Sequence, residues 1–198
     1  MMHGNDIGIS IDEIRVILPK IYYGFIVFAS CMTSITSSMI SLEGKSFNIT
    51  KSLPVAPEKI LLAKVLASNI ISIPIVLISD VIFFVAFKVN ITDIVFILLA
   101  SVIMPTVTAL IGILMNLTYP KMDATSDTEV VKQSMSSALS IFIGMFLGIL
   151  SIVIIIIGSK INLNLFIILE LLVFSLIIFV LWKILKKYGI KKFREINV

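Results

Sequence analysis

The chain has 198 residues, of which 59% are hydrophobic and only 14% charged, and its mean hydropathy is +1.13. Soluble domains carry about a quarter charged residues, so this composition excludes an ordinary soluble protein and predicts an integral membrane protein. The net charge of +4 gives no reason to expect nucleic-acid binding, because the position of positive residues in a membrane protein matters more than their total.

We expect an all-α membrane protein: a polytopic bundle of about five transmembrane helices with two structured cytoplasmic loops. Residues 1–15 form a polar segment, in which Ser10 and Glu13 have the spacing of a capping box for a helix beginning near Ile11. The transmembrane domain covers residues 16–187, and residues 188–198 form a basic cytoplasmic tail. Apolar runs of sufficient length predict spans at about 16–42, 60–87, 91–117, 134–157 and 163–185.

Several residues predict how these spans begin, bend and pack. Pro74 and Pro105 lie inside the second and third spans, where membrane helices tolerate kinks. Ser126 and Glu129 form a capping box ahead of the fourth span, whose Gly144 and Gly148 allow another helix to approach closely. The first span contains a hydroxyl cluster that we expect to serve helix packing through bonds to the helix backbone: Thr33, Ser34, Thr36, Ser37 and Ser38.

The distribution of Lys and Arg predicts the orientation. Residues 43–64, residues 119–132 and the chain from 183 hold four, two and six of these residues, which is twelve of the sixteen. By the positive-inside rule, the two polar loops and the C-terminus are cytoplasmic, and the N-terminal segment is not. No signal peptide is evident at the start, so we expect a preceding helix to be missing and further helices or a second copy to complete the domain.

Two carboxylates, Asp80 and Glu170, lie inside spans. An acid within the membrane is costly and is by default a candidate for a transport path, because it must face the bundle interior, a water-filled cavity or a partner charge. The alternative is that each reaches the headgroups, or that Asp80 pairs with nearby Lys88.

Nothing in the chain predicts catalysis, a metal site or a cofactor. Cys31 lies in an apolar run and His3 in the polar start, so neither a Ser/His/Asp arrangement nor a Cys/His cluster is present. Gly44-Lys45-Ser46 ends like a phosphate-binding loop, but Met39 stands where that motif needs its first glycine. We therefore do not expect an enzyme.

Two motifs resemble the cytoplasmic loops of permease subunits of ABC transporters of the second exporter type. The first is Ser41-Leu42-Glu43-Gly44-Lys45, with Lys51-Ser52-Leu53-Pro54 and Lys59-Ile60-Leu61-Leu62-Ala63-Lys64 after it. The second is Tyr119-Pro120-Lys121-Met122-Asp123, followed by Glu129-Val130-Val131-Lys132-Gln133-Ser134. The resemblance covers residues 18–133, although the family often has Trp where Asn48 stands.

The resemblance implies a subunit of the cell membrane that moves a solute while a separate ATPase subunit hydrolyses ATP. Residues 43–59 would be the loop that couples to this ATPase, through Glu43, Gly44, Lys45, Lys51, Ser52, Leu53, Pro54 and Glu58. The second cytoplasmic loop would contribute Pro120, Lys121, Asp123, Glu129 and Lys132.

Two other functions remain open. The chain could be a non-transporting membrane scaffold, a regulatory subunit or a degenerate permease fragment, as the missing helix and the absent Trp suggest. It could instead be a secondary transporter that uses Asp80 and Glu170, although we see no internal repeat and no pair of discontinuous helices.

Overall fold

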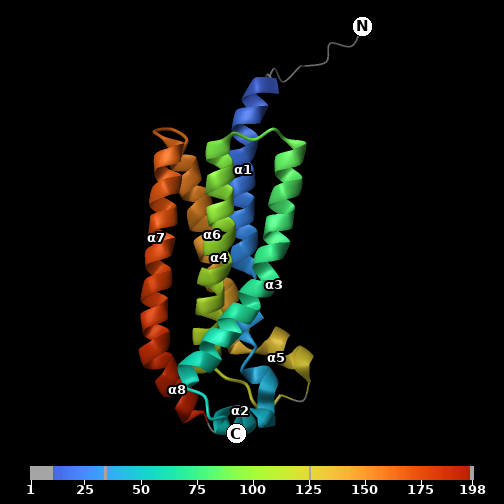
Figure 1. Ribbon diagram of the computed structural model, residues 1–198, viewed down its shortest axis with the longest axis vertical. Coiled ribbons are helices and arrows are strands. Elements are labelled where there is room, and N and C mark those ends of the chain that lie inside the picture. The colour runs from blue at the N-terminus through green and yellow to red at the C-terminus, as the bar shows by residue number, and fades with distance from the viewer. Residues whose placement is uncertain (1–10, 34, 125, 197–198) are drawn as a thin grey trace.

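The computed structural model describes residues 11–33, 35–124 and 126–196, with side chains from Arg15 onward. The described residues contain helices and no strand. Five long apolar helices run along one axis (Figure 1), and the prediction of an all-α membrane bundle with five spans is confirmed. These helices are α1 (Ile11–Met32), α3 (Pro57–Ala86), α4 (Ile91–Thr118), α6 (Met135–Gly158) and α7 (Leu163–Ile184).

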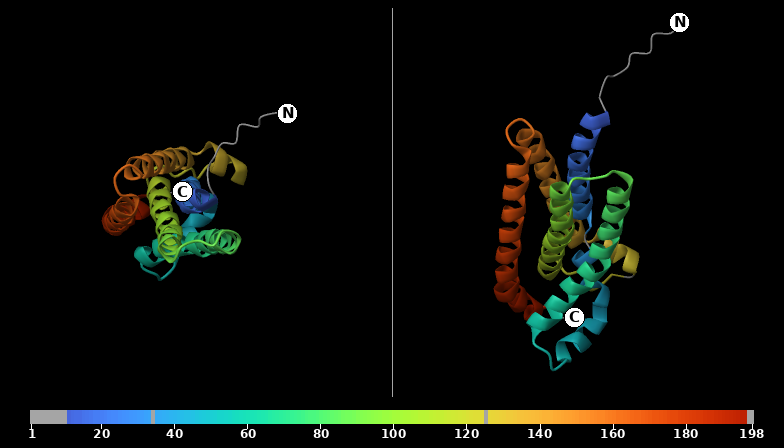
Figure 2. Two further views of the ribbon diagram at one scale, coloured as in Figure 1. Left: turned by 90° about the horizontal axis from the view of Figure 1, so that it is seen from above. Right: turned by 45° about the horizontal axis from the view of Figure 1, so that its top comes forward.

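Helix α4 lies at the centre, where it contacts α1, α3, α6 and α7. The view from above shows the other long helices arranged around it (Figure 2). Most of the α4 surface is buried, whereas α3, α6 and α7 expose apolar side chains on their outer faces. This distribution is the one expected where lipid tails cover the outside, because an apolar face then needs no protein partner.

The fold places small residues where helices approach most closely. A side chain added at Gly144 of α6 would put its Cβ 2.0 Å from the carbonyl oxygen of Cys31 in α1, and one at Gly148 would meet Phe28 at 2.7 Å. The Gly144/Gly148 pair therefore packs α6 against α1 within the chain, as such pairs do in membrane helices.

The first span differs from the prediction, because its α-helix ends at Met32 rather than near residue 42. The chain continues through two tight 3₁₀ turns, η1 (Ile35–Ser37) and η2 (Ser41–Ser46), to the short helix α2 (Phe47–Ser52). Thr36 donates a hydrogen bond to the Ala109 carbonyl at 2.7 Å, and Ser37 pairs with Ser137 of α6 at 3.2 Å. Thr33 and Ser38 bond to carbonyls three residues before them, as expected, whereas Thr36 and Ser37 bond to other helices, which allows irregular backbone to stay buried beside a bundle.

Two further short helices, α5 and α8, lie in the segments that follow α4 and α7. The capping box is confirmed at Ser126, which accepts from the Glu129 amide, but it begins a separate helix α5 (Asp127–Gln133) rather than the fourth span. Ser134 caps α6 itself by accepting from the Ser137 amide at 3.2 Å. After α7, a π turn, η3 (Leu185–Gly189), leads into α8 (Ile190–Glu195).

Candidate functional site

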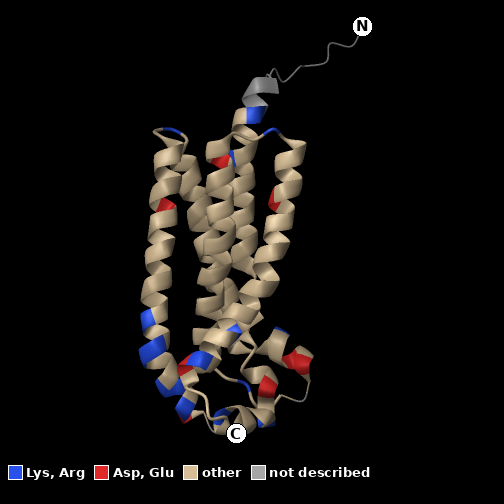
Figure 3. Cartoon of the chain, viewed as in Figure 1, with Lys and Arg blue, Asp and Glu red and all other residues tan. Residues whose placement is uncertain are grey.

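Both predicted loops and the C-terminal segment meet at one end of the bundle, which we call the basic end. It consists of η2, α2, the start of α3, residues 119–133 and the chain from Lys183. Figure 3 shows Lys and Arg concentrated there, with few charges along the helices. Segments far apart in the sequence therefore build one surface, and specific side chains hold them together.

Asn116, near the end of α4, joins this surface to the bundle. Its side chain is fully buried, and its amide oxygen accepts from the backbone N–H of Ile40 at 2.7 Å and of Ser41 at 3.2 Å. Its NH₂ group donates to the hydroxyls of Ser41 at 2.7 Å and Ser136 at 3.2 Å. One amide thus satisfies two backbone donors that the 3₁₀ turns leave without a helical partner.

Ser41 also connects the two loops to each other. Its hydroxyl accepts a hydrogen bond from the backbone N–H of Lys121 at 2.9 Å. Close by, Gly44 has φ +47°, in the region that glycine adopts without steric cost, and its Cα faces the Met122 carbonyl. Gly44 is therefore a turn residue fitted against the second loop.

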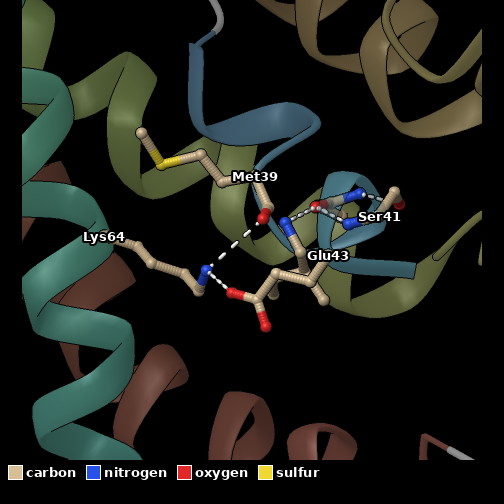
Figure 4. A network of polar contacts seen from close by, with 6 residues as sticks. Met39, Ser41, Glu43 and Lys64 are labelled. Carbon is tan, nitrogen blue, oxygen red and sulfur yellow. Dashed lines mark hydrogen bonds and ion pairs between the residues drawn. The ribbon is translucent and has the colours of Figure 1, made fainter. Parts of the chain in front are cut away.

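The Glu43 carboxylate forms an ion pair with Lys64 of α3 (Figure 4). Lys64 also donates to the Met39 carbonyl at 3.3 Å. Both charged side chains are largely shielded, with 15% of Lys64 and 22% of Glu43 exposed. Glu43 therefore holds η2 to α3, and the charge that the sequence suggested for partner contact is engaged inside the chain.

Helix α2 packs against α8 at the outer surface of the basic end. The fully buried Phe47 ring meets Phe193 edge-on, with ring centroids 5.0 Å apart. The Lys51 ammonium donates to the carbonyls of Arg194 at 3.1 Å and Ile196 at 2.8 Å, which lie at the end of α8. A cation at the C-terminus of a helix is favourable because the last carbonyls there lack helical partners.

The segment 188–198, predicted as a basic cytoplasmic tail, is helical over most of its described residues and packs against α2, α3 and α4. Apolar Ile190, Phe193 and Ile196, spaced three apart among basic residues, were the signal for this helix. Glu58, at the start of α3, adds an ion pair to Lys186 at 2.8 Å, between side chains that are both exposed.

Several predicted contact residues of the first loop point to solvent. Lys45, Ser52, Leu53 and Pro54 are exposed, and Ser52 bonds only to the carbonyl of Ile49, one turn before it. Ile49, which the sequence did not single out, exposes 67% of its surface. A groove of about 530 Å³ opens beside this turn, with an apolar lining and charged residues at its edge: Met39, Glu43, Leu53, Val55, Lys59, Ile60, Ala63, Lys64 and Ala67.

In the second loop, Lys121 and Glu129 form an ion pair at 2.7 Å. Pro120 ends the α4 segment and is partly buried, while Asp123 and Lys132 are exposed. The structure therefore brings all five predicted residues of this loop to the basic end, with two of them bonded to each other.

Asp80 and Glu170 are both buried among the helices of the bundle. Asp80 is fully buried and accepts from Ser101 at 2.6 Å and Tyr22 at 3.1 Å, so the alternative of a pair with Lys88 was wrong. Glu170 is 3% exposed and accepts from Tyr23 at 3.3 Å. Tyr22 and Tyr23, which are consecutive in α1, thus donate hydrogen bonds to carboxylates on two different helices, α3 and α7.

The residues that the structure describes contain no group of three or more His, Cys, Asp or Glu side chains placed to hold a metal ion. Cys31 is buried in the core, where packing was its expected role. His3 and Ser10 lie outside the described residues. No family model, curated protein or solved structure matches the chain.

Proposed function

We propose that the chain is a transmembrane subunit, or part of one, of an ABC exporter of the cell membrane, and that it couples to a separate ATPase through residues 43–59. The observation that carries this proposal is the position of α2: a short helix with exposed apolar side chains, held firmly at the end of a membrane bundle. The basic end then faces the cytoplasm, as the positive-inside rule requires.

Exposed apolar residues support a docking role for this loop. Ile49, Leu53 and Val55 expose 67%, 49% and 43% of their surfaces, in a segment that also carries charged residues: Glu43, Lys45, Lys51, Glu58 and Lys59. Lipid tails do not explain such exposure in a charged loop, whereas contiguous exposed apolar residues are typical of protein interaction sites. Lys45 and Lys59 beside them would orient an acidic face of the partner.

The internal bonds of the basic end provide a route for mechanical coupling. A force on α2 reaches α8 through Lys51, α3 through the Glu43–Lys64 pair, and α4 through Ser41 and Asn116. ATP binding by the partner can bias the bundle only if the contact with α2 differs in energy between two states. A loop fastened to three helices is suited to this task because its movement cannot leave those helices unchanged.

Co-purification tests the proposal. A tagged chain, extracted in gentle detergent, is expected to retain an ATPase subunit, and Ile49→Glu combined with Leu53→Glu is expected to lower that recovery at least tenfold. Ile161→Glu is the matched control, because Ile161 is 74% exposed on the opposite end of the bundle. Equal recovery from wild type, control and double variant, or recovery of no ATPase from any of them, would reject the coupling role.

The double variant Lys51→Glu with Pro54→Gly tests the turn at residues 51–54 in a transport assay. Export driven by ATP is expected to fall, since the first change repels the carbonyl end of α8 and the second releases the backbone. The effect must appear without loss of protein from the membrane, which an immunoblot measures. Unchanged export with both substitutions would contradict a coupling function of this turn.

A membrane scaffold or regulatory subunit is the second candidate, and Asn48, where the resembling family often has Trp, favours it. A scaffold would still bind a partner through α2, but it would move no solute with ATP. A reading frame for an ATPase next to the gene would favour the permease.

A secondary transporter is favoured by the break after Met32 and by the buried carboxylates, and transport without ATP would identify it.

A further inference from the structure

A second polar site lies away from the basic end, where α1, α6 and α7 meet around Glu170. Tyr23 from α1 donates to one carboxyl oxygen, Oε2, at 3.3 Å. Ser151 from α6 faces the same carboxyl group. The second oxygen, Oε1, and the Ser151 hydroxyl are both buried, and neither completes a hydrogen bond among the described residues.

The site contains no positive charge to stabilise a carboxylate. Glu170 has no ion pair with any described residue, and its immediate polar neighbours are Tyr23 and Ser151. The helices packed around it contribute few ionisable groups: α6 has none, α4 has only Asp93, and α1 has Tyr23 and Cys31 near the carboxyl and Lys20 beside Asp93. An ionised carboxylate without a counter-charge is strongly disfavoured in such surroundings.

Asp80 provides a contrast within the same bundle. Its side chain is equally buried, but both carboxyl oxygens accept hydrogen bonds, from Ser101 and from Tyr22. Each carboxyl oxygen of Asp80 thus has a hydrogen-bond donor. At Glu170 only Oε2 accepts a hydrogen bond, so an ionised carboxylate would leave Oε1 buried without a donor.

We propose that Glu170 is a proton-binding site: its carboxyl group carries a proton on Oε1, the oxygen without a donor, while Oε2 accepts from Tyr23. The ligand is a single proton, and its release leaves a carboxylate that must gain water or a cation. This inference is independent of the ATPase partner, because it rests on the contacts between α1, α6 and α7.

Infrared spectroscopy of the purified protein tests the site, because a protonated carboxyl group has a carbonyl stretch that a carboxylate lacks. At neutral pH we expect this band in the wild type and in Asp80→Asn, and its loss in Glu170→Gln. Raising the pH should remove the wild-type band while the fold persists.

Labelling the wild type with ¹³C-glutamate keeps the test decisive if Glu170→Gln fails to fold. The band must then shift with this label, and it must stay in place when aspartate is labelled instead. Absence of the band from folded protein at neutral pH would overturn the proposal. So would a band that survives in Glu170→Gln or shifts only with labelled aspartate.

Discussion

Asn116 and Ser41 exchange two hydrogen bonds across the bundle: the Ser41 backbone N–H donates to the Asn116 amide oxygen, and the Asn116 NH₂ group donates to the Ser41 hydroxyl. The two residues are 75 positions apart in the chain. Because the Ser41 hydroxyl also accepts a hydrogen bond from the backbone N–H of Lys121, this contact fixes both loops of the basic end to α4. The contact explains how irregular backbone can lie buried at this end.

Asn116→Ala should destabilise the fold more than an asparagine change elsewhere. It leaves the N–H groups of Ile40 and Ser41 without an acceptor, and each buried unpaired group costs about 1–3 kcal/mol, so we expect a loss of about 2–6 kcal/mol. The measurement is the midpoint of thermal unfolding in detergent. Asn69→Ala is the control, because Asn69 makes one side-chain bond to Thr106 and should cost about 1 kcal/mol. Equal midpoints for the two variants would contradict the assigned role.

Reversing the charge of either Glu43 or Lys64 should destabilise the attachment of η2 to α3. Both side chains are largely shielded, so we expect about 2 kcal/mol for each single reversal, between the values for exposed and fully buried pairs. The double variant Glu43→Lys with Lys64→Glu should recover at least half of this loss. The rate of protease cleavage within residues 41–53 measures how firmly η2 is attached. If the effects of the two changes simply add, the ion pair contributes nothing.

Gly144→Ala should separate α6 from α1. The new methyl group would lie 2.0 Å from a backbone oxygen of Cys31, which cannot move without shifting the helix. We expect a loss of about 3 kcal/mol, at the upper end for overpacking, measured as thermal unfolding in detergent. Gly148→Ala is the matched control with about 1 kcal/mol, because the ring of Phe28 can rotate away from the added methyl. A larger effect at Gly148 would contradict this packing.

Labelling of engineered cysteines tests the orientation. In a Cys31→Ser background, Ser46→Cys at the basic end should react with a membrane-impermeant thiol reagent only after the cells are opened. Ser159→Cys, exposed at the opposite end, should react in intact cells. The expected asymmetry follows from the positive-inside rule. Labelling of position 46 from outside would reverse the orientation and place the basic end away from any cytoplasmic partner.

The extent of each span after the first could be predicted because length and hydropathy define a membrane helix directly. The ends of α4 and α6 lie within one residue of the predicted bounds. The break after Met32 could not be predicted, since the chain there is as apolar and hydroxyl-rich as a helix would be. Its cause is non-local: Thr36, Ser37 and Ser41 bond to partners about 70 to 100 positions later.

The candidate site shows the same division between local and distant information. Turn residues such as Gly44 and Pro54 were recognisable because their backbone preferences are local. The partners of Glu43 and Lys51 were not, because they come from α3 and from the end of α8. Asp80 was matched to Lys88, eight positions away in the sequence, whereas the hairpin places it against Ser101 of α4.

The central claim is that α2 docks onto a separate ATPase, and photo-crosslinking in native membranes tests it most directly. A photoreactive amino acid at position 49 should attach the chain covalently to an ATP-binding subunit, and the same amino acid at position 161 should not. Mass spectrometry of the crosslinked band identifies the partner. Absence of any ATPase crosslink from position 49, in membranes where the chain is folded and the probe reacts, would contradict the account.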